Sequence, residues 1–255
     1  MEKLRIIMNL MRADIISLLG FKKRLAVIIA AATVLSVLTG AFFIPVYSLV
    51  LLTMAILITS DIINLEAQTG SGKLTSVLPT DRQSVVYARF ALGTLTVTGF
   101  GAVMFALMQL SMKLRIYALF MEYDEIFELM GIPSSADNVF NVLFGCAYFI
   151  SLAAMSFMLK GNFKHGAVSS KNSLIKTFVK LIIIYVAFSV TFAVLIKMST
   201  LPILGSLMTL ITGVIAALAD PLKGVLLLAL LIAAGLGHTV YMAVSSMIEY
   251  EKREL

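Results

Sequence analysis

Few side chains in this sequence could perform chemistry inside its long apolar segments. The two histidines are His165, in a polar segment, and His238, in an apolar one, and the single cysteine is Cys146. None of the 14 acidic residues falls in the middle of an apolar block. A hydrolase needs a nucleophile with its base or paired acids, and a metal centre needs clustered ligands. We therefore expect no catalytic centre and no metal site, and we expect that the chain is not an enzyme.

One segment looks like a phosphate-binding loop. Residues 69–74 read TGSGKL, whereas the pattern GxxxxGK[ST] requires a glycine five residues before the second glycine and a hydroxyl after the lysine. Ala67 and Leu74 occupy those two positions. The sequence therefore predicts no ATP site and no cofactor in this chain.

The distribution of charge predicts membrane-spanning helices. Between Arg24 and Asp61 there are 36 residues without a charge or a histidine, which is too many for one helix across about 30 Å of hydrocarbon and enough for two. The break between the two is expected at residues 40–45. Hydrophobic residues make up 60% of the chain, and the mean hydropathy is +1.00. Four more spans are predicted at 85–112, 139–159, 181–196 and 224–247. The fold class is therefore an all-α polytopic membrane protein with six transmembrane helices.

Basic residues predict the orientation of these spans, because cytoplasmic loops keep an excess of Lys and Arg. With both termini inside, 16 basic residues lie on the cytoplasmic side and four on the outer side. The basic loop 160–180 is then cytoplasmic and the acidic loop 113–138 is outside. The net charge of +6 describes a face toward anionic lipid, and no nucleic-acid partner is expected. Arg89 lies near the end of its block, where it could snorkel to water.

Two further segments have distinctive patterns. Residues 1–24 place apolar side chains opposite Arg5, Asn9 and Arg12, which predicts an amphipathic helix at the membrane surface. The apolar positions of this helix are Leu4, Ile7, Met8, Met11, Ile15, Leu18 and Leu19. Within 198–223, the apolar stretch 203–219 lies between Pro202 and Pro221. It is either re-entrant from the outer side or a seventh span.

The loop at residues 61–84 carries the most informative motif. The preceding span is expected to continue into the cytoplasm, break at 70–72, form a short helix and stop at Pro79. Glu66, the run LPTDR at 78–82, then Val85 or Val86 and Arg89 resemble the E...LPxxR...V...R/K pattern of ABC-2 type permeases. The particular likeness is to small permeases of bacterial peptide exporters, and in topology it covers nearly the whole chain.

The resemblance implies a single ABC-2 transmembrane domain over residues 1–255, located in the bacterial cytoplasmic membrane. It implies two copies of the permease working with two copies of a separate ATPase subunit, which holds the ATP and Mg²⁺. The loop would carry the helix that docks on this ATPase, and loop 160–180 would be a second contact, although topology alone also explains its charges. The expected ATPase-coupling residues are Glu66, Lys73, Leu74, Val77, Leu78, Pro79 and Arg82. The re-entrant form of 198–223 also follows from the resemblance.

Hydroxyl residues within the spans leave two interpretations open. Thr33 and Ser36 share a face of the first span, and Thr94 and Thr98 share a face of the third. They could line a mildly polar cavity together with His238, or they could simply pack helices closely. His238 could likewise be a packing residue or a proton relay. The favoured cargo is an amphipathic or hydrophobic peptide of antimicrobial or modulin type, exported from the cell. The alternatives are a lipid or drug exporter, a pH-driven secondary transporter using His238, and a regulatory membrane protein without a transport path.

Overall fold

The described part of the chain is entirely helical. The computed structural model describes residues 2–20, 22–42, 44, 46–69, 82–116, 136–165, 213 and 220–252. These residues form six helices and contain no strand. The helices are α1 (Glu2–Gly20), α2 (Lys22–Phe42), α3 (Val46–Thr69), α5 (Arg82–Lys113), α7 (Ala136–His165) and α10 (Pro221–Lys252).

Four of the described helices are long and apolar enough to cross a bilayer. They are α3 over Val46–Asn64, α5 over Gln83–Lys113, α7 over Asp137–Lys164 and α10 over Pro221–Tyr250. The helix α2 adds a shorter apolar segment, Ile29–Gly40. Backbone polar groups must be paired inside lipid, and helices pair them internally. The chain is therefore a membrane-embedded α-helical protein.

The predicted break after the first apolar helix is confirmed. The helix α2 ends at Phe42 and α3 begins at Val46, so the turn falls within residues 40–45. The amide of Tyr47 donates to the carbonyl of Ile44 at 3.2 Å. A Cβ built on Gly40 would overlap the Tyr47 ring, so glycine is what allows this ring to close the hairpin.

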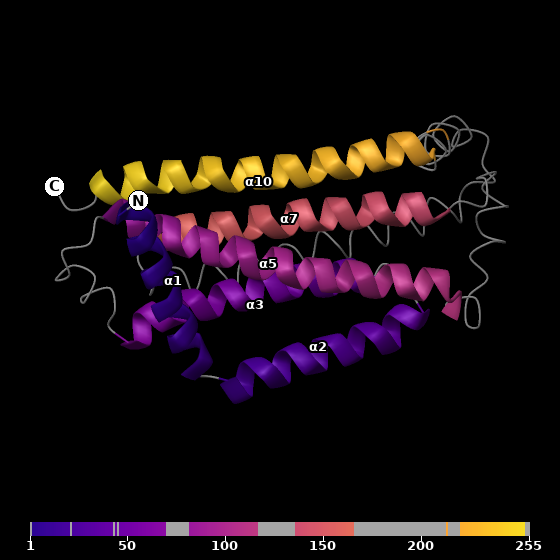
Figure 1. Cartoon of the computed structure of the whole chain (residues 1–255), viewed down its shortest axis with the longest axis horizontal. Helices are drawn as coiled ribbons and strands as arrows, with labels where there is room; N and C mark the ends of the chain where they lie inside the picture. Colours follow the sequence, from indigo (N-terminus) through magenta and orange to yellow (C-terminus); the bar gives the residue numbers. More distant parts are fainter. Residues whose placement is uncertain are drawn as a thin grey trace, which may run out of the picture.

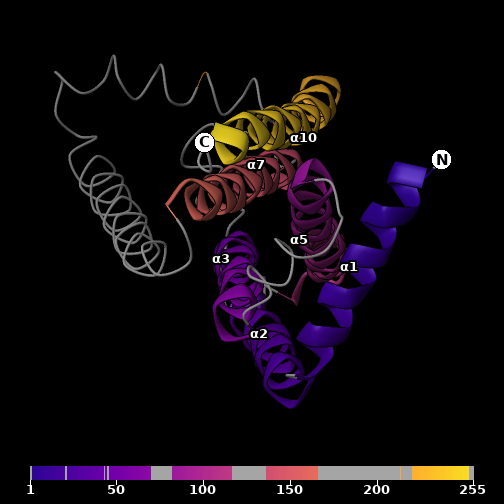
Figure 2. The same cartoon turned by 90° about the vertical axis from the view of Figure 1, so that its left-hand side faces the viewer.

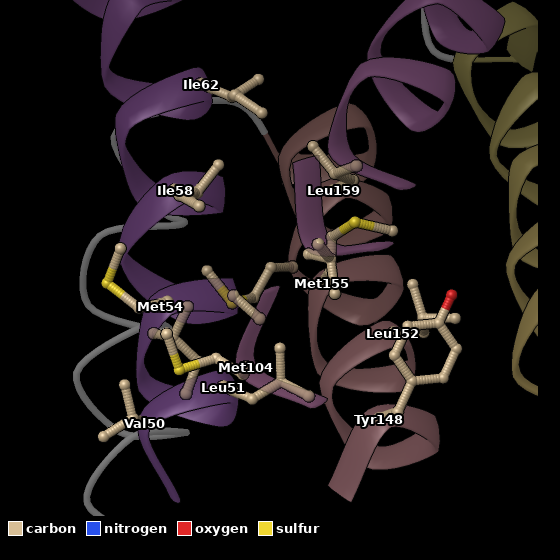
Figure 3. Packing of buried hydrophobic residues seen from close by; sticks show 14 of the residues in the cluster. Val50, Leu51, Met54, Ile58, Ile62, Met104, Tyr148, Leu152, Met155 and Leu159 are labelled. Carbon is tan, nitrogen blue, oxygen red and sulfur yellow. The ribbon is translucent and has the colours of Figure 1, made fainter. Parts of the chain in front are cut away.

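The buried core lies between α3, α5 and α7. Figure 3 shows part of it, with Leu51 and Met54 from α3 facing Leu152 and Met155 from α7. The helices α5 and α7 are antiparallel, because residues later in α5 contact residues earlier in α7. Gln109 donates to Asn141, the hydroxyls of Thr98 and Tyr148 lie 2.8 Å apart, and Gly93 packs against Met155.

The helices α7 and α10 run side by side in the same direction (Figure 1). Gly145 packs against Leu228, Leu152 against Gly235, and the hydroxyl of Ser156 against that of Thr239 at 3.3 Å. The partner on α10 lies 83 positions later each time, which is possible only for parallel helices. The end of α7 and the start of α10 therefore lie at opposite ends of the bundle.

The helix α1 lies across one end of the bundle, which we call the α1 end. In Figure 2, which faces this end, α3 and α5 are seen nearly end-on while α1 is seen from its side. It contacts α5, α3 and α2, and Met11 packs against the core cluster. The helices α3, α7 and α10 end at the α1 end, and α5 begins there (Figure 1).

Several predicted segments are partly or wholly outside the described residues. Helices take up the edges of the predicted loops: α3 continues to Thr69, α5 begins at Arg82, α7 extends over 136–165 and α10 begins at Pro221. Helix extends past the apolar blocks because helix formation needs no hydrocarbon around it. The centre of the coupling loop (70–81), most of the outer loop, the fifth predicted span (181–196) and nearly all of 198–219 lie outside the described part.

Candidate functional site

The two described flanks of the predicted coupling segment lie at the α1 end of the bundle. Glu66 lies in the last two turns of α3, and Arg82 is the first residue of α5. The remaining predicted coupling residues lie outside the described part of the chain: Lys73, Leu74, Val77, Leu78 and Pro79. The structure therefore brings the two flanks of this segment to one end, beside α1 (Figure 1).

Arg89 follows two turns later in α5 and is buried. Its side chain is only 4% exposed, and its guanidinium lies 5.8 Å from the ring centroid of Phe163 in α7. Phe163 also stacks on Phe90 at 6.3 Å and meets the edge of Tyr250 in α10 at 5.4 Å. The prediction that Arg89 snorkels to water is wrong, because a face of α5 carries it into the contact with α7. We call Arg89, Phe90, Phe163 and Tyr250 the aromatic junction.

An ion pair joins α7 and α10 at the same end. The Nζ of Lys160 lies 3.3 Å from Oε1 of Glu249 and donates to the hydroxyl of Ser245 at 2.8 Å. The other carboxylate oxygen, Oε2, is buried and has no hydrogen-bond partner within the described residues. Sequence reasoning placed Lys160 in a basic loop and did not identify this pair. Its two residues are 89 positions apart, and no local pattern relates them.

His238 belongs to α10 and packs against aromatic side chains of α7. Its ring centroid is 5.5 Å from that of Phe157 and 6.3 Å from that of Phe149. Its Nε2 is buried and finds no hydrogen-bond partner in the part of the chain that is described. The described contacts of His238 are therefore packing contacts with α7.

The four hydroxyl residues lie on two helices and make contacts typical of packing. Thr33 and Thr94 donate to carbonyls one turn back in their own helices, at 2.8 Å and 2.7 Å. Ser36 contacts the sulfur of Met104 at 3.5 Å, and Thr98 pairs with Tyr148 of α7. No hydrogen bond among the described residues joins any of these four to His238. They remain candidates for a cavity, but the contacts they make are those of helix packing.

Metal ligation has no support in the described ranges. Among these residues, no group of three or more His, Cys, Asp or Glu side chains could hold a metal ion. Comparison with known proteins gives no match to any protein-family model, to any curated protein or to any solved structure. The helices and the residues at the α1 end are therefore the features from which a function can be inferred.

Proposed function

We propose that this chain is the permease subunit of an ATP-binding-cassette exporter, driven by a separate ATPase. Two copies of the permease would work with two copies of the ATPase, which binds ATP and Mg²⁺. The cargo would be an amphipathic or hydrophobic peptide of antimicrobial or modulin type. The membrane would be the bacterial cytoplasmic membrane, with both termini inside. The proposal starts from the ABC-2-like residues at 66–89, and the geometry of the α1 end supports it.

The main support is that side-chain contacts at the α1 end link the start of α5, next to the predicted coupling segment, to α7 and α10. Arg82 opens α5, and two turns later the aromatic junction connects α5 to α7 and α10. The Lys160–Glu249 pair adds a second link between α7 and α10. A push on residues 70–81 would thus act on three helices together, because packed interiors transmit strain.

The direction of α10 supports six spans. The parallel direction of α7 and α10 agrees with an odd number of membrane crossings between them. One crossing, at the predicted 181–196, gives six spans and leaves 203–219 as the re-entrant outer segment. Two crossings would make α10 antiparallel to α7. We therefore retain the six-span topology, with α1 as the interfacial helix.

The test is reconstitution with and without an ATPase subunit. We expect ATP-dependent efflux of a fluorescent amphipathic peptide from vesicles that contain both subunits. Replacing Leu78, Pro79 and Arg82 with alanine should abolish efflux while ATPase binding falls. The matched control replaces three residues of the outer loop, Glu122, Asp124 and Glu125, and should leave efflux unchanged. Efflux that persists in the first variant would contradict the coupling role, and a labelled lipid or drug in place of the peptide tests the alternative cargoes.

A pH-driven secondary transporter is the second candidate, and His238 is the observation that favours it. Its buried Nε2 lacks a hydrogen-bond partner within the described residues, so protonation there would change the contact between α7 and α10. This function predicts uptake or efflux driven by a pH gradient without nucleotide. It also predicts loss of that transport in His238→Phe. The exporter function instead predicts that His238→Phe retains ATP-driven transport.

A further inference from the structure

The outward face of α10 carries an apolar seam along most of the helix. Its positions are alternately four and three residues apart, which is the spacing of the a and d positions in a coiled coil. The α10 seam consists of Leu226, Leu230, Ala233, Gly237, Val240 and Val244, all of them exposed. The opposite side of α10 packs on α7 and α5, and α10 lies at the margin of the bundle (Figure 2). The seam is therefore a helix-binding pattern that the described part of the chain does not use.

On α3, α5 and α7, exposed large apolar side chains stop before the helices reach the α1 end. Among residues whose burial is described, the last of them are Leu57 in α3, Leu95 in α5 and Phe157 in α7, apart from Tyr87, whose ring carries a hydroxyl. In α5 these side chains extend from Leu95 to Leu114. That distance is about 29 Å at 1.5 Å per residue, which matches the roughly 30 Å of hydrocarbon in a bilayer. The edge of the hydrocarbon toward the α1 end therefore lies near Leu95.

The apolar surface of α10 continues past this edge. Gly93 of α5 packs against Met155 of α7, and α7 pairs with α10 residues 83 positions later, so Leu95 lies near the level of residues 236–238. Beyond that level, α10 exposes Val240, Tyr241, Val244 and Ile248, at 63%, 67%, 39% and 50%. This stretch reaches about 15 Å past the hydrocarbon. Acyl chains do not cover it there, and exposed apolar surface outside the hydrocarbon marks a contact with protein.

We propose that two copies of this chain pair through the α10 seam, with the two α10 helices parallel and in register. This pairing would join the two permease copies of the proposed function, on which it rests. A two-fold axis along the membrane normal brings each seam residue to the depth of its counterpart. A second α10 is apolar both within the hydrocarbon and beyond it, whereas acyl chains would cover only the first part and a soluble partner only the second. Ala233 and Gly237 lie near the middle of the seam, where small residues let two helices approach closely.

Disulfide crosslinking of the full-length chain tests this surface. The single cysteine, Cys146, is replaced with alanine, and one new cysteine is introduced as Val244→Cys in the seam or as Tyr87→Cys in α5. These positions are matched controls, because they are 39% and 36% exposed and both lie beyond the hydrocarbon. The proteins are oxidised in vesicles at a low protein-to-lipid ratio, since excess detergent would dilute a helix pair. We expect a disulfide-linked dimer from Val244→Cys and a monomer from Tyr87→Cys. No dimer at Val244, or equal crosslinking at both positions, would overturn the proposal.

A steric pair of variants provides a second test in the Val244→Cys background. Ala233 and Ala234 are both exposed, but only Ala233 belongs to the seam. Ala233→Trp should therefore reduce the crosslinked dimer, and Ala234→Trp should leave it intact; the same dimer yield from both would refute the seam. Efflux measured with an ATPase subunit separates this pairing from the exporter function. ATP-driven efflux without crosslinking at Val244 would refute the seam alone, whereas crosslinking without such efflux would support the seam and contradict the exporter.

Discussion

Replacing Gly235 with valine should separate α7 from α10, whereas the same change at Gly237 should not. A Cβ on Gly235 would lie 3.1 Å from Cδ1 of Leu152 and 3.5 Å from the Cα of Phe149, while one on Gly237 would meet nothing within 4 Å. The leucine side chain can move, but the α7 backbone at Phe149 cannot move alone. The two γ-carbons of valine extend further toward α7, so the helices must part or the side chain must leave its rotamer.

Overpacking of this kind costs about 1–3 kcal/mol. For a protein of this size each kcal/mol lowers the melting temperature by about 2–4 °C, so Gly235→Val should melt about 2–12 °C lower. Valine has a slightly higher helix propensity than glycine, and this gain is the same at both positions. Because a side chain at position 237 meets no other atom, the Gly237→Val protein should melt at the wild-type temperature or slightly above it.

A thiol-reactive dye can follow this unfolding in detergent, because Cys146 of α7 is the single cysteine. Both glycine variants keep this reporter, so their melting curves compare directly. Equal melting temperatures for the two valine variants would refute the close approach of α7 and α10 at Gly235, and with it the parallel pairing.

Three further changes test the other described contacts. Lys160→Met should lower the free energy of unfolding by about 1 kcal/mol, because it leaves the half-buried Glu249 without its cation. Adding Glu249→Met should recover most of this loss. A double variant less stable than Lys160→Met alone would contradict the ion pair. Phe163→Leu should lower the free energy of unfolding by about 1–3 kcal/mol, because the Phe163 ring contacts Arg89, Phe90 and Tyr250. An unchanged melting curve would show that the aromatic junction does not stabilise the protein. Asp220→Ala should lower the free energy of unfolding by about 1 kcal/mol. The Asp220 carboxylate accepts hydrogen bonds from the amides of Leu222 at 3.0 Å and Lys223 at 3.3 Å at the start of α10. Asp220→Asn should keep most of this stability, because its amide oxygen can accept the same hydrogen bonds.

The sequence predicts the helices well where the signal is local. Long uncharged blocks indicate spans by composition alone, and the break after the first block follows from Gly40 and Pro45 within an otherwise uniform apolar run. The four spans found in the described residues agree with four of the six predicted ones. The hairpin of α2 and α3 could be placed because adjacent helices with a short connection must be antiparallel.

The sequence does not predict contacts made between distant residues. Lys160 and Glu249 are each surrounded by polar neighbours that suggest a loop and a tail, and only the packing of α7 on α10 pairs them. Arg89 stands near the end of an apolar block, so hydropathy favours a snorkelling side chain. Packing against Phe163 of α7 is what buries the Arg89 side chain, and hydropathy does not report this contact. Thr98 is similar, since its hydroxyl is compatible with a cavity or with packing until Tyr148 is known to lie beside it.

The most direct measurement is transport by the purified chain, alone and together with an ATPase subunit, in vesicles without a pH gradient. We expect an amphipathic peptide to move only when both subunits and hydrolysable ATP are present, and not with a non-hydrolysable analogue. Movement by this chain alone, or movement that depends on a proton gradient and ignores ATP, would contradict the proposal.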